Sequence, residues 1–318
     1  MLILSTIKPP EELINKMNMV FSEDEFIFYS EMKEALEDLP RADILITYGE
    51  DLTPVLIEKA QRLKWIMVMS AGLELMPLDA IKEKGILVTN ARGIHKIPMA
   101  EYTLSMMLHV AKKNKQLLQQ EERKSWNRVT IIPVEELHGK TVGILGVGAI
   151  GGEIARLCKA FNMKVLGLNR SGADQQYVDE MYQYSGLEYI CSHADYIVSV
   201  LPSTNETKYL LKDSHFRVMK NQPVFINIGR GDVVKEEDLL YALHSKKISH
   251  AVLDVFEQEP LPVYHPFWEL DQVTVTPHIS SKTSKYLPRS FEIFEQNFHI
   301  LKQGRNDFIN KIDSERGY

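Results

Sequence analysis

The stretch Lys140-Thr-Val-Gly-Ile-Leu-Gly-Val-Gly-Ala-Ile-Gly-Gly152 decides the fold of this chain. Residues 141–145 form a short apolar run that is typical of a buried strand, and a helical pattern follows from Glu153 onward. Between the two lie the three glycines of a G-x-G-x-x-G pattern, at Gly146, Gly148 and Gly151. A strand, a glycine turn and a helix in this order are the context that a dinucleotide-binding fingerprint requires.

Each glycine has a separate task in such a turn. Gly146 permits the tight turn, Gly148 lets the backbone approach a pyrophosphate, and Gly151 lets the helix pack closely on the strand. The first helical residues, Ala149 and Ile150, then offer free N–H groups and a partial positive charge to the phosphates. Glycine-rich turns between a strand and a helix also occur without a ligand, so the nucleotide site needs support from other motifs.

Length, charge and cysteine content limit the classes of protein to which this chain can belong. A chain of 318 residues is long enough for two domains, and its net charge of −6 with scattered basic residues does not favour a nucleic-acid partner. No apolar run approaches the length of a membrane span, and residues 1–5 are too short for a signal peptide. Cys158 and Cys191 lie in apolar patterns without metal-ligand spacing, which predicts buried thiols in a cytoplasmic protein and no metal site.

Short apolar runs alternate with helical segments on both sides of the glycine turn, which predicts parallel sheets covered by helices. Strands are expected at 2–5, 26–29, 42–48, 65–69, 86–88, 164–168, 194–201, 224–228, 250–254 and 273–276. Helices are expected at 10–17, 32–39, 53–60 and 291–301, the third capped by Thr53. The helical stretch 98–126 is either one long helix that bridges two domains and extends into a subunit interface, or a long surface helix followed by a loop. We therefore predict an α/β fold with two doubly wound parallel sheets.

The residues that close the second strand after the glycines bear on the choice of nucleotide. Enzymes that use NAD place an Asp or Glu there to bind the ribose hydroxyls. Asn169, Arg170 and Ser171 occupy this place, so no carboxylate would repel a 2′-phosphate, and Arg170 offers a fork of donors. We therefore favour NADP(H), while NAD(H) stays possible because some NAD enzymes lack the acid and this segment could be an ordinary turn.

Four further stretches point to a family. They are Leu201–Thr207 (LPSTNET), Asn227–Asp232 (NIGRGD), Asp254–Pro262 (DVFEQEPLP) and Thr276–Ile279 (TPHI). Together with the glycine turn they resemble the D-isomer-specific 2-hydroxyacid dehydrogenase family over nearly the whole chain. The resemblance implies a Rossmann dinucleotide-binding domain, over 98–283, inserted into a flavodoxin-like substrate domain over 1–97 and 284–318. It also implies an active site between the domains and a homodimer formed through the nucleotide domains.

The resemblance further implies a catalytic trio at Arg230, Glu259 and His278. Reduction of a 2-keto acid requires a hydride donor, a proton donor for the forming alkoxide and a cation for the carboxylate. An imidazole exchanges protons near neutral pH, a carboxylate would orient it and favour its protonated form, and a guanidinium can bind a carboxylate bidentately. Each residue alone could be an ordinary surface histidine, turn residue or loop ion pair. Their joint presence near strand ends, in a chain with a nucleotide fingerprint, favours catalysis.

Other family positions carry over onto both halves of the chain. The loop that would bind the substrate carboxylate falls on Ala71, Gly72 and Leu73, and it continues with Glu74-Leu75 where many members have an Asp. This departure leaves the identity of the 2-keto acid open. The remaining positions expected to line the nucleotide are Leu201, Pro202, Thr207, Ile228 and Asp254.

The sequence thus favours an NADPH-dependent reductase of a small 2-keto acid, such as glyoxylate or hydroxypyruvate, that forms the D-2-hydroxy acid. An alternative from another class is a corepressor-like binding protein that senses NAD(H), because some relatives of this fold keep the catalytic trio and use the nucleotide as a ligand.

Overall fold

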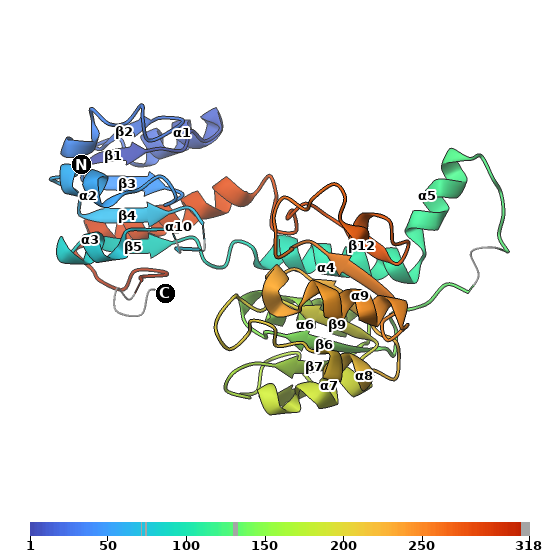
Figure 1. Cartoon of the computed structure of the whole chain (residues 1–318). Coiled ribbons are helices and arrows are strands. Elements are labelled where there is room, and N and C mark those ends of the chain that lie inside the picture. The colour runs from blue at the N-terminus through green and yellow to red at the C-terminus, as the bar shows by residue number, and fades with distance from the viewer. Residues whose placement is uncertain (71, 74, 130–132, 313–318) are drawn as a thin grey trace. The chain divides into compact units, whose positions relative to one another are not determined.

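The computed structural model describes residues 1–70, 72–73, 75–129 and 133–312 (Figure 1). The chain divides into two compact units, the first made of Met1–Ile94 with Thr283–Tyr318 and the second of His95–Lys282. The chain therefore leaves the first unit after residue 94 and returns to it at residue 283. The domain boundaries predicted from the sequence lie between residues 97 and 98 and between residues 283 and 284.

The first unit contains a five-stranded sheet in which every neighbouring pair is parallel. Its strands, in the order in which they pair, are β2 (Glu25–Phe28), β1 (Leu2–Ser5), β3 (Ile44–Thr47), β4 (Trp65–Val68) and β5 (Leu87–Asn90). Its helices are α1 (Glu11–Val20), α2 (Pro54–Lys59), α3 (Leu78–Glu83) and α10 (Tyr286–Lys302). This strand order is that of flavodoxin-like doubly wound folds. As predicted, Thr53 caps α2, since its hydroxyl accepts the N–H of Leu56 at 3.3 Å.

Helix α10 completes the first unit although it lies near the C-terminus of the sequence. Its rings Phe291, Phe294 and Phe298 are buried against the same core as the fully buried Trp65 of β4. Phe294 stacks on Trp65 with ring centroids 5.2 Å apart and an interplanar angle of 6°. Aromatic packing from a distant part of the sequence therefore holds the first sheet.

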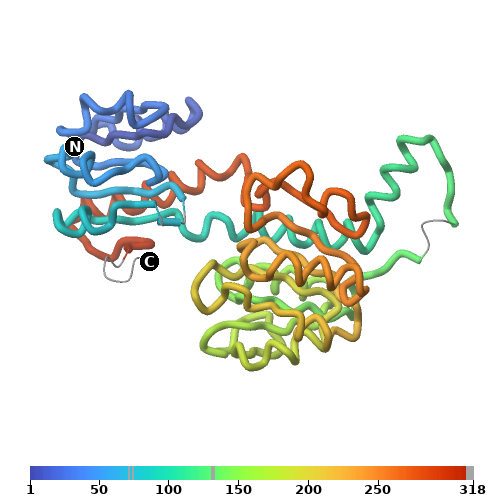
Figure 2. Tube along the Cα trace, viewed as in Figure 1, coloured from blue at the N-terminus to red at the C-terminus, as the bar shows by residue number. Residues whose placement is uncertain are grey.

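The second unit contains a seven-stranded sheet, and its neighbouring strands are again all parallel. In pairing order its strands are β12 (Val273–Val275), β11 (His250–Leu253), β10 (Val224–Asn227), β9 (Tyr196–Ser199), β6 (Thr141–Leu145), β7 (Lys164–Leu168) and β8 (Glu180–Tyr182). Its helices are α4 (Lys96–Ala111), α5 (Asn114–Glu122), α6 (Ala149–Ala160), α7 (Leu187–His193), α8 (Asp213–Arg217) and α9 (Glu236–His244). Two apolar clusters form its core, one with residues from α4 and α6 and the other with residues from α7, α8 and α9. Figure 2 shows the path of the backbone through these elements. Counted from β6, the order 3-2-1-4-5-6 extended by one strand is that of the Rossmann fold, so both predicted sheets are confirmed.

Two predicted helices are wrong. Residues 32–38 form successive turns, with bonds such as Ala35 N–H to Met32 O at 3.1 Å, and the 3₁₀ turn η1 (Leu39–Arg41) follows. Pro40 lies within η1, where its ring disfavours a helical residue before it. The stretch 98–126 is not one helix either, because Lys113 adopts φ 53° and separates α4 from α5. α4 buries Met107 and Ala111, whereas α5 has no buried residue that would hold a straight continuation against the core.

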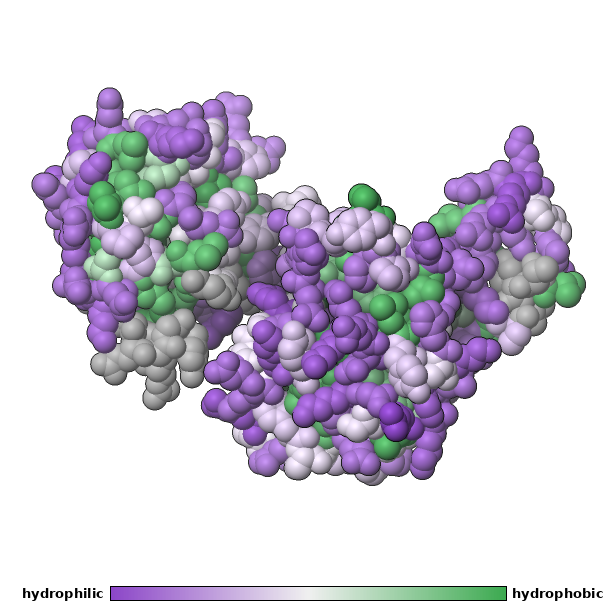
Figure 3. Space-filling model, in the orientation of Figure 1, coloured by the Kyte–Doolittle hydropathy of each residue, from purple (hydrophilic) through white to green (hydrophobic). Residues whose placement is uncertain are grey.

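Hydrophilic side chains cover most of the visible surface of each unit (Figure 3). None of the helices in the described part of the chain combines the length and the apolar character needed to cross a membrane.

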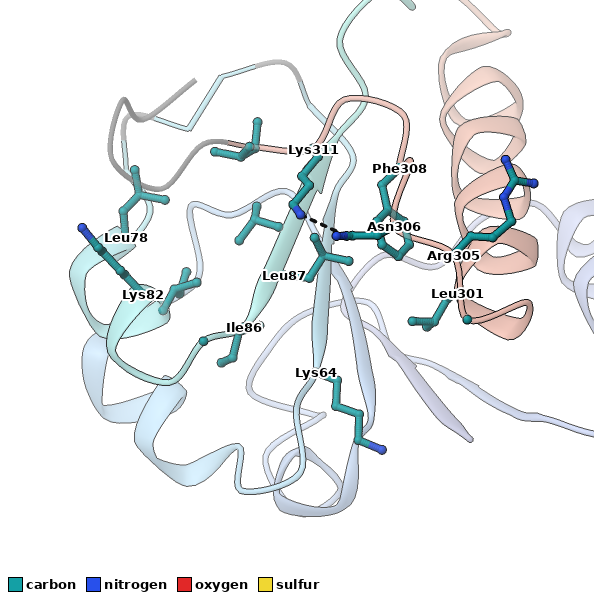
Figure 4. Close-up of a pocket in the computed structure, with 15 residues that line it drawn as sticks. Lys64, Leu78, Lys82, Ile86, Leu87, Leu301, Arg305, Asn306, Phe308 and Lys311 are labelled. Carbon is teal, nitrogen blue, oxygen red and sulfur yellow. Dashed lines mark hydrogen bonds between the residues drawn. The ribbon is translucent and has the colours of Figure 1, made fainter.

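A pocket of about 510 Å³ lies in the first unit between α3, β5 and the segment that follows α10 (Figure 4). This segment runs beside β5, with Ile312 N–H donating to Val88 O at 2.9 Å. Lys311 Nζ donates to Asn306 Oδ1 at 3.0 Å across the pocket wall. Residues 310–312 therefore cover the outer edge of β5, and the predicted site residues do not line this pocket.

The stacking of Phe294 on Trp65 leads to a testable prediction about stability. Phe294→Ala is expected to lower the free energy of unfolding of the first unit by about 3–5 kcal/mol, because it leaves a cavity beside the indole. Urea unfolding followed by Trp65 fluorescence, in a Trp126→Phe, Trp268→Phe background, measures this loss. The matched control is Met19→Ala on the exposed face of α1, where 77% of the residue is accessible, and a loss of less than about 0.5 kcal/mol is expected. Equal losses in both variants would contradict the proposed importance of the stack.

Candidate active site

The glycine turn joins β6 to α6 in the conformation that the sequence predicts. Gly146 has φ 103°, a backbone conformation that side-chain-bearing residues rarely adopt. Its N–H and that of Val147 both donate to Leu168 O, at 2.9 and 3.0 Å, which fixes the turn to the end of β7. A Cβ atom added to Gly151 would lie 2.3 Å from the carbonyl oxygen of Gly146, so α6 can approach the turn only with a glycine there.

The turn leaves room for a phosphate group. A Cβ atom added to Gly148 would meet nothing within 4 Å, so the backbone at this residue borders open space. α6 begins at Ala149, and the first N–H groups of a helix have no partner within the helix. Open space beside unpaired N–H groups and the positive end of a helix dipole suits the pyrophosphate of a dinucleotide.

In the segment after β7, two residues form the turn and the residue between them is accessible to a ligand. Asn169 Oδ1 accepts the N–H of Gly172 at 2.6 Å and the hydroxyl of Ser171 at 3.1 Å. Asn169 and Ser171 thus build the turn. Arg170 between them is exposed and makes no hydrogen bond or ion pair with any residue that the structure describes. Its guanidinium is therefore available to a ligand.

Three of the residues predicted to line the nucleotide are almost fully buried. Leu201, Thr207 and Ile228 expose 4%, 2% and 2% of their surface, whereas Pro202 is exposed. The Thr207 hydroxyl donates to Pro202 O at 2.5 Å and accepts the N–H of Thr204 at 2.9 Å. Thr207 therefore shapes the loop after β9, and Pro202 is the member of this set that a ligand can reach.

His278 and Glu259 form a hydrogen-bonded pair. The two side chains lie 2.7 Å apart through His278 Nδ1 and Glu259 Oε2, and both are partly exposed. The other carboxylate oxygen of Glu259 accepts the N–H of Phe256 at 3.0 Å, which holds the carboxylate in place. His278 Nε2 has no partner within the described ranges, so it is free to exchange a proton with a ligand.

Arg230 lies on the loop that follows β10, beside the segment that carries Glu259. Asn227 at the end of β10 holds this loop by donating its side-chain amide to Arg230 O at 2.9 Å. A Cβ atom added to Gly231 would lie 2.0 Å from the carbonyl carbon of Phe256, so the two segments touch. The Arg230 guanidinium is bonded to Gly229 O at 2.8 Å and to no carboxylate in the described structure. Contacts through Phe256 thus link the segments of all three predicted catalytic residues, and Asn227 is a supporting residue that the sequence did not reveal.

Asp254 supports the loop of His278. It exposes 0% of its surface, and its carboxylate accepts the Thr276 hydroxyl at 2.6 Å and the N–H groups of Ile279 and Ser280, each at 2.9 Å. The family resemblance implies that this residue lines the nucleotide. These bonds make Asp254 an anchor for the loop of His278, and its place beside the nucleotide stays a prediction.

The loop predicted to bind the substrate carboxylate follows β4 in the first unit. Ala71 lies outside the described residues. Gly72 accepts the hydroxyl of Ser70 through its carbonyl at 3.0 Å, and Leu73 is 8% exposed. No group of three His, Cys, Asp or Glu side chains that could hold a metal ion occurs over the residues described.

Two adjacent glycines of α6 provide a test of the nucleotide site. Gly151→Ala is expected to weaken the binding of NADPH and NADH by about tenfold or more, because the new methyl group displaces α6 from the turn. A Cβ atom at Gly152 meets nothing within 4 Å, so Gly152→Ala should retain binding and raise helix stability by about 0.5–1 kcal/mol. Isothermal titration with each nucleotide measures the difference. Equal affinities in the two variants would show that the close approach of α6 is not needed.

Known proteins resemble this chain in sequence. The family model described as D-isomer specific 2-hydroxyacid dehydrogenase, NAD binding domain, matches residues 104–280, more than half of the chain. Glyoxylate reductase of Pyrococcus furiosus is 31% identical over 303 residues, which are 91% of this chain and 90% of the relative. D-3-phosphoglycerate dehydrogenase of Methanocaldococcus jannaschii is 34% identical over 260 residues, 80% of this chain. The matched part is 48% of that relative, so this chain spans about half of its length.

Solved structures agree with the sequence comparison. A D-isomer specific 2-hydroxyacid dehydrogenase family protein from Aeromonas salmonicida superposes with a TM-score of 0.85 at 35% identity, covering 98% of both chains. The NADPH-dependent glyoxylate/hydroxypyruvate reductase of Sinorhizobium meliloti, solved with NADP and sulfate, superposes with a TM-score of 0.78 at 26% identity, covering 100% of this chain and 99% of the other. Two parallel sheets, a nucleotide-binding turn and these matches lead to one conclusion: the chain belongs to the D-isomer-specific 2-hydroxyacid dehydrogenase family, oxidoreductases that use a nicotinamide dinucleotide.

Proposed function

We propose that this protein reduces a small 2-keto acid to the D-2-hydroxy acid with NADPH, and that glyoxylate and hydroxypyruvate are its substrates. The observation that carries the proposal is the His278–Glu259 pair at 2.7 Å, in the unit that holds the nucleotide turn. This pair uses Nδ1, and no described residue bonds to Nε2. Relatives named glyoxylate reductase and glyoxylate/hydroxypyruvate reductase support the choice of substrate.

The residues of this chain would divide the chemistry as follows. When bound, the reduced nicotinamide supplies the hydride. His278 Nε2 donates a proton to the keto oxygen, while Glu259 orients the ring through Nδ1. The Arg230 guanidinium binds the substrate carboxylate and stabilises the negative charge that develops on the keto oxygen. The backbone N–H groups of Gly72 and Leu73 are proposed to bind the same carboxylate, with Ala71 in the same loop.

The preference for NADPH is proposed from Arg170. A guanidinium that has no partner among the described residues, in a turn without a carboxylate, suits a 2′-phosphate better than it suits the two hydroxyls of NADH. The Sinorhizobium meliloti reductase, which was solved with NADP, supports this choice. NAD(H) remains the second cofactor to test.

A homodimer and a cytoplasmic location are further parts of the proposal. Apolar side chains are exposed on α5 and on the segment after it, namely Leu117, Leu118, Trp126, Val129 and Val134. Such a cluster suits burial against a second copy of the chain.

Cys158 and Cys191 are free and buried, as predicted, which fits a reducing compartment.

Replacement of His278 tests the reaction. Initial rates with glyoxylate, hydroxypyruvate, pyruvate and phenylpyruvate, each with NADPH and with NADH, should show turnover of the first two. His278→Ala is expected to lower kcat by about 10²–10⁴-fold because it removes the proton donor, and Glu259→Gln should lower it by a smaller factor. The exposed His244 of α9 provides the control, and His244→Ala should retain the rate. Tight nucleotide binding without turnover of any acid would instead favour the binding-protein alternative.

Replacement of Arg170 tests the cofactor preference. Arg170→Gln is expected to raise the KM for NADPH by about 10–100-fold and to leave the KM for NADH nearly unchanged, because a hydrogen bond to a charged group contributes about 1.5–3 kcal/mol. Steady-state kinetics with each nucleotide measures this difference. Arg217→Gln on α8 is the control, since Arg217 pairs with Asp213 away from the turn. A wild-type preference for NADH would refute the cofactor assignment and leave the reductase proposal intact.

A further inference from the structure

A chain of hydrogen bonds connects α4 to the loop that carries His278. The hydroxyl of Tyr102 lies 2.6 Å from the hydroxyl of Thr276, and Thr276 Oγ1 donates to Asp254 Oδ1 at 2.6 Å. Tyr102 belongs to α4, Thr276 directly follows β12, and Asp254 directly follows β11. All three residues belong to the second unit, so three separate elements of one unit meet at this point.

The chemistry of the three groups fixes the direction of the bonds. A carboxylate only accepts hydrogen bonds, so the single proton of the Thr276 hydroxyl points to Asp254. Thr276 Oγ1 must then act as the acceptor toward Tyr102, whose hydroxyl donates. Burial raises the pKa of Tyr102 to about 12, so this donor keeps its proton throughout the neutral range. The donors therefore run in one direction, from Tyr102 through Thr276 to Asp254.

Asp254 transmits this support to the backbone around His278. Its side chain accepts the N–H groups of Ile279 and Ser280, and its carbonyl oxygen accepts the N–H of His278 at 3.0 Å. His278 itself has φ 51°, a left-handed conformation that costs a side-chain-bearing residue free energy. The bonds to Asp254 hold three consecutive residues in place and stabilise this conformation.

We propose that Tyr102 and Thr276 are positioning residues that hold His278 in its working conformation by fixing the carboxylate of Asp254. The role in turnover rests on the proposed function of His278, whereas the effect on the loop does not. Neither hydroxyl needs to touch substrate or cofactor. Loss of the chain should therefore lower kcat while the KM values for both ligands stay close to those of the wild type.

Four variants separate positioning from general stability. Thr276→Val removes the hydroxyl and should lower kcat about 10–100-fold, whereas Thr276→Ser keeps the hydroxyl and should stay within about twofold of the wild type. Tyr102→Phe removes only the outer donor and should lower kcat about 2–10-fold. Tyr196→Phe is the control, because Tyr196 is a second buried tyrosine of this unit for which the described structure shows no hydroxyl hydrogen bond. Unchanged kcat in Thr276→Val, or KM values that rise as much as kcat falls, would overturn the proposal.

Hydrogen exchange provides a readout that does not depend on activity. The amides of Ile279 and Ser280, which donate to Asp254, should exchange about tenfold faster in Thr276→Val and several-fold faster in Tyr102→Phe. Thr276→Ser and Tyr196→Phe should exchange like the wild type. If the wild type reduces none of the 2-keto acids, the proposed function fails, but faster exchange in the first two variants still supports the positioning chain. Exchange that is unchanged in Thr276→Val would refute it.

Discussion

Parallel pairing of the seven strands of the second unit is the constraint on which the candidate site depends. Because every neighbouring pair is parallel, the carboxyl ends of the strands meet at one edge of the sheet. The glycine turn follows β6, Arg170 follows β7, and Arg230 follows β10. The segments with Glu259 and His278 follow β11 and β12. Residues separated by more than a hundred positions in the sequence therefore lie at the same edge of one sheet.

The same edge explains why glycine is needed where the chain turns back. Gly151 lets α6 approach the carbonyl oxygen of Gly146, and Gly231 lets the loop of Arg230 lie against Phe256. A side chain at either position would push a functional segment away from its neighbour. These glycines therefore matter because they lack a side chain. At Gly151 and Gly231, neighbouring backbone fills the place that a Cβ atom would take, and at Gly148 this place is open.

The sequence predicted the elements that are determined by local pattern. β6 and β7 begin and end where expected, because strands buried on both faces are continuous apolar runs. The stretch 98–126 was misjudged because its polar half has good helix formers but no core to pack against, and only the structure shows Lys113 in a left-handed conformation. The strand β8 was missed because its three residues, Glu180–Tyr182, are too few to show a period. In both cases the element is determined by tertiary contacts, which the local sequence pattern does not reveal.

In the candidate site, too, short motifs reveal some residues, whereas others depend on contacts with distant parts of the sequence. Arg230, Glu259 and His278 could be chosen from the sequence because each stands in a short motif. The buried state of Asp254 could not, because a carboxylate that binds a ligand and one that binds backbone N–H groups are identical in sequence. Its carboxylate is hydrogen-bonded to Thr276, which lies 22 positions away, and through Thr276 to Tyr102 in a helix from the other end of the unit. The left-handed conformation of His278 costs free energy, and the bonds from residues 278–280 to Asp254 offset part of this cost. The motif that carries His278 is thus local in sequence, but the conformation of His278 depends on bonds to residues from distant elements of the second unit.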